Sequence, residues 1–306
     1  NFMHSDEVEE VVVQASLLNV TEDEIGDPLH ILSGSDISDL GTVSLGEALD
    51  SLVGVTSADY GSAVGQPIIR GLSGSRVKIL TNGLVNRDVA GIGADHKNEV
   101  DLNDIQQIEI VRGPSSLLYA NGVTGGIINI VDNTIAMEDV VDRVFKLGLE
   151  TQSVNSGDAQ SFSVKDNLGG LNVYFSYSDA SLGNYDVPSG AILHEEEHHD
   201  EDEEDGDHDE HEEDMGYLEN SDSAQEATRF GVSKVADWGY LGLSFSSSES
   251  LFGVPYHGES HEGHDEHGDE EEGHDEHEGE RIFSNTDSDK FAIRGSVAVD
   301  NDLVKN

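Results

Sequence analysis

Residues 107–130 constrain the fold more than any other stretch of this sequence. Ile108, Ile110 and Arg112 recur at every second position, which predicts a strand. Gly113-Pro114 ends that strand, because proline has no N–H to offer to a sheet ladder. Ser115 or Ser116 can then cap a helical turn, Asn121-Gly122 ends it, and residues 127–131 form a second strand. The order strand, turn, short helix, strand indicates a core element of an α+β domain.

A second patterned segment, residues 67–83, predicts two strands joined at glycines, with Asn82-Gly83 as a type I′ hairpin turn. Together the two segments resemble the two signatures of the plug domain of TonB-dependent outer-membrane receptors. The first carries Ile-Arg-Gly and Arg-Val, and the second carries Arg-Gly-Pro, Leu-Tyr and Gly-Gly-Ile-Ile-Asn-Ile. The match departs only where residues 120–122, Ala-Asn-Gly, replace the usual single Gly after Tyr119. The resemblance implies a plug domain over residues 25–135.

Local signals add detail to this domain. Residues 30–32 predict a strand, and Ser44 predicts the N-cap of a helix over residues 45–52 with Glu47 in the capping-box position. Arg70, Arg76 and Arg112 are three of only 15 basic residues in the chain. Because a guanidinium pairs bidentately with carboxylates, we expect these arginines to form ion pairs between the plug and a barrel wall. Surface solubility is the alternative role.

After Asp132 the sequence changes to segments near ten residues long in which apolar and polar residues alternate. The clearest examples lie at residues 145–149, 171–177, 241–245 and 291–299. Strands with one apolar and one polar face are typical of transmembrane β-barrels, although a soluble β-sandwich would alternate too. The connections also differ in length: 167–170 and 237–239 are tight, whereas 182–223 and 251–285 are long.

The predicted fold class is therefore an α+β plug domain followed by antiparallel transmembrane β-barrel strands, about six of them within residues 136–306. The resemblance implies a barrel of about 22 strands. Six strands with open edges cannot lie in lipid, where every backbone N–H needs a partner, so the barrel is incomplete in this chain and we expect a longer protein. The resemblance also implies that the tight turns face the periplasm and the long loops face the exterior.

Composition excludes several classes of protein. The chain has 64 acidic and 15 basic residues and a formal charge of −49, which disfavours nucleic acid as a partner and favours cations. It has no cysteine, so any metal site must use histidines and carboxylates. No apolar run is long enough for a transmembrane helix. The N-terminus lacks a basic region followed by an apolar core, so we expect any signal peptide to have been removed.

Residues 1–24 are acidic and contain one patterned segment, Glu10, Val11, Val12 and Val13. An edge strand is the simple interpretation. The segment is also similar to the TonB box of these receptors, and the resemblance implies that it adds a strand to a TonB-type periplasmic energy-coupling protein.

The two long loops contain eleven of the 14 histidines, among many Asp and Glu residues. They are His194, His198, His199, His208 and His211 in the first loop, and His257, His261, His264, His267, His274 and His277 in the second. Residues 263–267, Gly-His-Asp-Glu-His, recur at residues 273–277. Neutral imidazole together with carboxylate suits Zn²⁺, and also Ni²⁺ or Cu²⁺, so the loops predict many weak metal sites. A solvated segment that serves only solubility is the alternative.

The loops, and Phe252-Gly253-Val254-Pro255-Tyr256-His257 before the second one, resemble the zinc-uptake group of these receptors related to ZnuD. That resemblance implies import of a divalent metal ion, zinc, across the bacterial outer membrane without covalent chemistry. It also implies that Asp95 and His96 in the plug are ligands of a defined site, with the remaining ligands on the barrel. A helix-capping Asp beside a surface His is the simpler interpretation of that dipeptide.

Two other functions fit parts of the sequence. A receptor for haem or a metal chelate would use loop histidines as axial ligands, but these loops have almost no aromatic residues for a haem pocket. A surface metal-buffering protein without transport would keep the histidines but would not need the plug signatures. Neither a Gly-x-Ser-x-Gly nucleophile motif nor a P-loop occurs, which predicts that the protein is not an enzyme.

Overall fold

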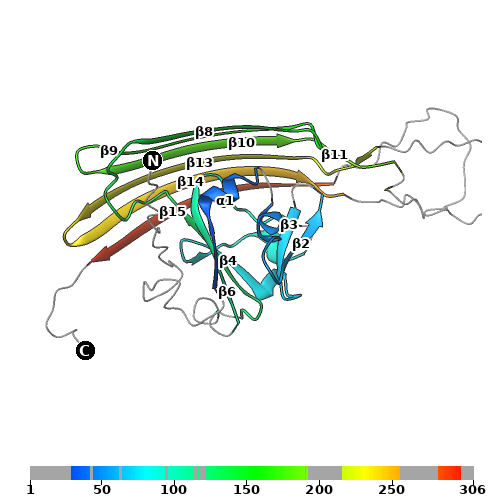
Figure 1. Cartoon of the computed structure of the whole chain (residues 1–306), viewed down its shortest axis with the longest axis horizontal. Helices are drawn as coiled ribbons and strands as arrows, with labels where there is room; N and C mark the ends of the chain where they lie inside the picture. Colours follow the sequence, from blue (N-terminus) through cyan, green and yellow to red (C-terminus); the bar gives the residue numbers. More distant parts are fainter. Residues whose placement is uncertain are drawn as a thin grey trace, which may run out of the picture.

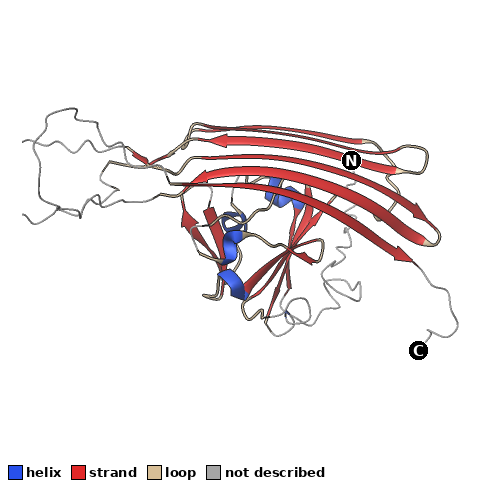
Figure 2. Ribbon diagram, turned by 180° about the vertical axis from the view of Figure 1, so that it is seen from behind, coloured by secondary structure: helices blue, strands red, loops and turns tan. Residues whose placement is uncertain are grey.

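The computed structural model describes residues 29–41, 44–61, 64–93, 96–113, 116, 122–189, 191, 216–255 and 282–297. Two layers make up this part of the molecule: a small mixed domain lies against one face of a long, curved antiparallel sheet (Figures 1 and 2). Residues 1–28, which include the predicted docking segment, and most of both histidine-rich loops lie outside the described residues. Among the described residues, every helix is too short or too polar to cross a bilayer.

The small domain is built on a five-stranded sheet in the order β1-β6-β7-β4-β5, in which only β4 and β7 pair in parallel. A separate hairpin, two short α-helices and two 3₁₀ turns make up the rest of the domain within the described residues. The strands are β1 (Leu29–Ser33), β4 (Val77–Thr81), β5 (Leu84–Val85), β6 (Ile105–Arg112) and β7 (Gly126–Asp132), the hairpin is β2 (Val55–Tyr60) with β3 (Val64–Ile69), and the helical elements are α1 (Gly34–Ser38), α2 (Leu45–Leu49), η2 (Gly74–Arg76) and η3 (Val89–Gly91).

Local sequence signals explain several of these boundaries. Ser44 caps α2 through its side chain, and the carboxylate of Glu47 accepts the N–H of Ser44, as the capping box predicts. The helix ends at Leu49 and not at residue 52, because the N–H of Leu52 bonds to the carbonyl of Leu49 in a tighter turn. The predicted Asn82-Gly83 turn joins β4 to β5, and both of its residues have positive φ.

The two central strands of the small domain are buried on both faces. Ile108, Ile110 and Ile128 have no exposed surface, and Glu109, which points to the other face of β6, is equally buried. Glu109 accepts hydrogen bonds from Asn129 at 2.8 Å and from Gln107 at 2.7 Å, so its burial leaves neither oxygen without a donor. The short helix predicted between residues 115 and 122 lies almost wholly outside the described residues.

The large sheet contains six antiparallel strands in the order β15-β14-β13-β10-β9-β8, as the alternating segments predict. Tight turns join β9 to β10 and β13 to β14. In the first long connection, between β10 and β13, β11 near its start pairs with β12 near its end. The strands are β8 (Val144–Gln152), β9 (Gly157–Asn167), β10 (Asn172–Leu182), β11 (Tyr185–Asp186), β12 (Tyr217–Leu218), β13 (Ser223–Ala236), β14 (Gly239–Gly253) and β15 (Phe283–Val297).

The two faces of this sheet differ in chemistry. One row of directly opposed residues crosses all six strands on the face away from the small domain: Phe145, Val164, Phe175, Phe230, Phe245 and Phe291. The adjacent row lies on the opposite face: Lys146, Ser163, Ser176, Arg229, Ser246 and Lys290. Since successive side chains of a strand point to opposite faces, the sheet has an apolar outer face and a polar inner face toward the small domain.

Candidate functional site

His96, the described member of the predicted Asp95-His96 pair, follows a loop that one buried side chain holds in place. Gln66 in β3 is only 4% exposed. Its side-chain amide nitrogen donates to the backbone carbonyls of Ala90 at 2.8 Å, Gly93 at 2.6 Å and His96 at 2.6 Å. The loop is therefore fixed to the hairpin at three points. Asp95 lies outside the described residues.

The segment after His96 runs along the polar inner face of the large sheet. Lys97 donates to Gln225 in β13 at 2.5 Å, and both carboxylate oxygens of Glu99 accept from Ser250 in β14 at 2.9 Å. Gln225 and Ser250 lie near the strand ends that lead into the long loops. The plug chain therefore meets the sheet first at its long-loop end.

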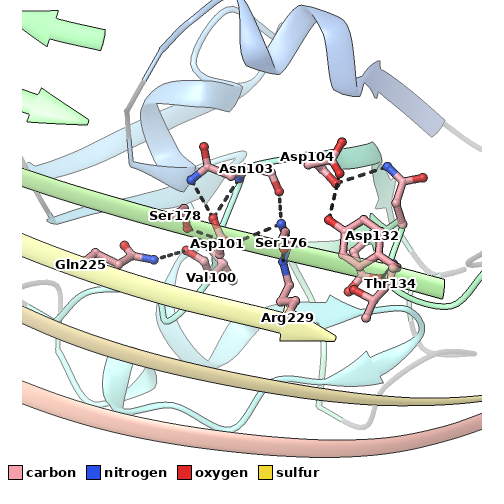
Figure 3. A network of polar contacts seen from close by, with 12 residues as sticks. Val100, Asp101, Asn103, Asp104, Asp132, Thr134, Ser176, Ser178, Gln225 and Arg229 are labelled. Carbon is pink, nitrogen blue, oxygen red and sulfur yellow. Dashed lines mark hydrogen bonds and ion pairs between the residues drawn. The ribbon is translucent and has the colours of Figure 1, made fainter. Parts of the chain in front are cut away.

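Further along the same segment, Asp101, Asn103 and Asp104 meet the sheet through a network of charges and hydrogen bonds (Figure 3). Arg229 in β13 lies 3.3 Å from the carboxylate of Asp101, and also donates to Ser176 at 3.1 Å and to the carbonyl of Asn103. Tyr174 and Lys146 donate to the two carboxylate oxygens of Asp104 at 2.8 Å and 2.7 Å. These contacts attach residues 97–104 to strands β8, β10, β13 and β14.

Burial shifts the pKa values of Lys97 and Glu99, which lie where the segment meets the long-loop end of the sheet. Burial lowers the pKa of Lys97, and the nearby Glu99 and Asp101 oppose that shift. Burial also raises the pKa of Glu99, against the hydrogen bond from Ser250 and the charge of Lys97. Each group thus partly offsets the cost of burying the other.

The turn between β2 and β3 contacts the bases of both long loops. A side chain added at Gly61 would come within 3.1 Å of Pro255, which follows β14, and of Ser221, which precedes β13. Val64 in β3 packs against the buried Phe252 at the end of β14. β2 and β3 lie toward the same end of the sheet as β11 (Figure 1). The hairpin that positions the His96 loop therefore lies at the same end of the sheet as the described bases of the two long loops.

The structure does not test the loop histidines. His194, His198, His199, His208, His211, His257, His261, His264, His267, His274 and His277 all lie outside the described residues, as do Glu10, Val11, Val12 and Val13. Within the described part of the chain, no group of three or more His, Asp or Glu side chains is arranged to hold a metal ion.

The three motif arginines lie in the small domain, and their predicted pairing with a barrel wall stays a prediction. Arg70 and Arg76 are exposed. Arg112 is 5% exposed, and its Nη1 donates to the carbonyl of Val53 at 2.6 Å. Its Nε and Nη2 have no partner among the described residues. Burial, and then the charge of Arg70, lowers the pKa of Arg112.

The charged contacts that do join plug and sheet were not predicted from the sequence. Here the carboxylates belong to the plug, on Asp101 and Asp104, and the cations belong to the strands, on Arg229 and Lys146. One signal could have found them: Lys146 and Arg229 each lie one position away from an outward phenylalanine, which assigns both to the inner face of the sheet.

Comparisons with known proteins agree with this architecture. Residues 21–127 match the TonB-dependent receptor plug domain. The vitamin B12 transporter BtuB of Photobacterium profundum is 29% identical over 106 residues, which are 34% of this chain and 17% of that protein. The chain thus spans a small part of the length of this relative.

Solved structures show the same fold. The copper transporter OprC matches with a TM-score of 0.56 and 14% identity over 74% of this chain and 32% of its own. The ferric-catecholate import receptor Fiu from E. coli K12 matches with a TM-score of 0.54 and 14% identity over 76% of this chain and 28% of its own. The predicted fold class, a plug domain followed by barrel-type strands that do not close in this chain, is confirmed. These relatives are transporters and receptors rather than enzymes, as the sequence predicts.

Proposed function

We propose that this chain forms the plug and the first strands of a TonB-dependent outer-membrane receptor that captures a divalent metal ion, zinc, and imports it. One observation carries the proposal: the loop that ends at His96 and the bases of both histidine-rich loops lie at the same end of the large sheet. Ions concentrated by the loops would thus be released next to the plug histidine. The copper transporter among the similar structures supports a metal as cargo.

Capture is the first step of the proposed mechanism. The acidic field of the loops attracts cations, and salt screens that attraction. Their imidazole and carboxylate groups hold ions weakly at many positions. Asp95 and His96 then supply two of about four ligands of a single defined site, and strands outside this chain supply the others.

Import is the second step. In the proposed mechanism, the segment around Glu10, Val11, Val12 and Val13 adds a strand to a TonB-type protein in the periplasm. Metal capture and energy coupling thus occupy opposite sides of the membrane. The barrel is embedded in outer-membrane lipid, and the apolar outer face of the six strands fits that environment.

The motif arginines complete this proposal. Arg112 is buried with two nitrogen atoms that lack partners among the described residues, and Arg70 adds a second positive charge nearby. A buried guanidinium in this state calls for carboxylate acceptors. We therefore assign to Arg70, Arg76 and Arg112 ion pairs with acidic residues on barrel strands outside this chain.

A receptor for a metal chelate is the second candidate, and the exposed apolar surface of the His96 loop favours it. Ile92 is 78% exposed, and an apolar side chain at this place suits an organic chelator better than a bare ion. The ferric-catecholate receptor among the similar structures is named for such a cargo. Binding of Zn²⁺ alone, compared with binding of ferric catecholate, distinguishes the two.

The test of the proposed site uses the protein at its natural length, purified in detergent. His96→Ala and Asp95→Ala should each weaken Zn²⁺ binding at one stoichiometric site by roughly ten-fold or more, because each removes a ligand, while the weak loop sites remain. Calorimetric titration and metal analysis measure both. His30→Ala, which removes the β1 histidine of the plug, is the matched control and should bind normally. Wild-type affinity and stoichiometry in both variants would show that the dipeptide is not a ligand pair.

A further inference from the structure

We propose that Gln66 is a positioning residue for the metal site: its buried amide fixes the backbone at His96, one of the proposed ligands. The inference rests on the proposed function and names the residue that makes the site rigid. Gln66 does not touch the metal in this scheme. It acts through the three carbonyl groups of the loop.

The geometry admits only a hydrogen-bond donor at this position. Three carbonyl oxygens, of Ala90, Gly93 and His96, converge on the side-chain nitrogen of Gln66 at 2.6 to 2.8 Å. An amide NH₂ carries two hydrogens, so at least one hydrogen is shared between two carbonyls. An acceptor in the same place would face three oxygens without a proton. The orientation of the amide is therefore fixed by its surroundings.

The strand that carries Gln66 is tightly packed. It lies in β3 between Val64 and Ile69, both fully buried, and β3 pairs with β2 along six residue pairs. Gly46 of α2 lies so close to Gly65 that an added Cβ would approach the carbonyl of Gly65 to 2.8 Å. Because the strand is closely packed, the hydrogen bonds of the Gln66 amide hold the loop at a fixed place relative to the strand.

The three hydrogen bonds hold the described backbone on both sides of residues 94–95. The carbonyl of Gly93 precedes the Asp95-His96 dipeptide, and the carbonyl of His96 belongs to it. The next residue, Lys97, is tied to Gln225 on the wall of the sheet. The backbone is thus held before, at and after His96. Metal sites need ligands fixed to within a fraction of an ångström, and residues that orient the ligands typically affect affinity by roughly 10- to 100-fold.

The test compares three substitutions at Gln66 in the natural-length protein that lacks residues 194–214 and 257–278, so that a single site can be titrated with Zn²⁺. Gln66→Met keeps the length and removes the donor, and Gln66→Glu keeps the shape and presents only acceptors. Each should weaken Zn²⁺ binding roughly ten-fold or more. Gln66→Asn keeps the amide on a shorter side chain and should weaken binding less. The control is Gln107→Met, which removes a buried plug amide that donates to Glu109, away from the loop.

The outcomes separate the two proposals. Graded loss of Zn²⁺ affinity in the Gln66 variants, with wild-type affinity in folded Gln107→Met, supports the positioning role. A general destabilisation of the plug would lower Zn²⁺ affinity in the Gln107 variant as well. Normal binding by folded Gln66→Met and Gln66→Glu, together with weak binding by His96→Ala, overturns the positioning role alone. If those two variants do not fold, wild-type affinity of Gln66→Asn overturns it. Normal binding by His96→Ala overturns the metal site and this inference with it.

Discussion

The plug and the large sheet use β-structure in opposite ways. The central plug strands β6 and β7 are buried on both faces, whereas each strand of the large sheet has an apolar face turned away from the plug and a polar face turned toward it. The plug therefore has its own hydrophobic core, and the two parts meet through polar groups. A polar contact can be exchanged for water more easily than an apolar one, which would suit the proposed passage of a cargo past the plug.

The largest expected effect comes from deleting the N-terminal segment that precedes the plug. Deletion of residues 7–14 should abolish transport and leave metal binding at the cell surface unchanged, because the proposed mechanism puts energy coupling and capture on opposite sides of the membrane. Uptake and surface binding of radioactive zinc in cells measure the two separately. Transport that survives the deletion would place the docking strand elsewhere.

A second test removes the charge at the centre of the contact between plug and sheet. Arg229 has 7% of its side chain exposed, so Arg229→Met should lower the free energy of unfolding by about 3–5 kcal/mol, because it leaves the largely buried carboxylate of Asp101 without its cation. Urea unfolding in detergent measures it. Arg143→Met is the matched control: Arg143 also pairs with an aspartate, Asp166, but is 68% exposed. This pair should contribute about 1 kcal/mol or less. Equal effects of the two substitutions would contradict the buried network.

A third test distinguishes the role of the histidine-rich loops from that of the large sheet. Deletion of residues 194–214 and 257–278 together should leave the barrel folded and slow uptake only when metal is scarce, because the loops concentrate ions and do not build the sheet. Uptake is measured over a range of Zn²⁺ concentrations, with circular dichroism as the check of folding. Unchanged uptake at the lowest concentration would leave only a solubility role for the loops.

Periodic parts of the molecule could be predicted from the sequence, and contacts between distant parts could not. The alternation at residues 241–245 places Leu241 and Leu243 on one face, and the structure has both half exposed on the outer face. The Asn82-Gly83 turn could also be predicted, because its two positive φ values depend on the residue types at those positions alone.

The missing information concerns pairs of residues far apart in the sequence. Gln66 meets His96 across 30 positions, and Lys97 meets Gln225 across 128. Neither pair has a local signature, because a Gln in a strand looks the same whether it holds a loop or faces solvent. His96 could be singled out by its residue type, but the side chain that fixes its backbone could not. The pairing of Asp101 with Arg229 and of Asp104 with Lys146 was missed for the same reason, although the neighbouring phenylalanines do assign the two cations to the inner face of the sheet.

The smallest expected effect is a dependence of stability on pH that arises at Glu99, in the upper part of the contact between plug and sheet. Burial raises the pKa of Glu99 above its ordinary value of about 4.3. The folded state therefore holds this proton more tightly than the unfolded state. The resulting stabilisation is complete below the ordinary pKa and is lost as pH rises through the raised pKa of the folded state.

Glu99→Gln removes this titration and keeps an acceptor for Ser250. Relative to the variant, the wild-type protein should therefore lose stability as pH rises from about 4 through the raised pKa, and the difference should then level off. Thermal unfolding of both proteins in detergent, measured side by side at each pH, cancels every titration that they share. A difference independent of pH would mean that water reaches the carboxylate and that the contact is open at its long-loop end. If the wild-type protein instead gains stability as pH rises, Lys97 and Ser250 outweigh the cost of burying the Glu99 carboxylate. The contact around Glu99 would then be stabilised by charge, like the contact around Arg229.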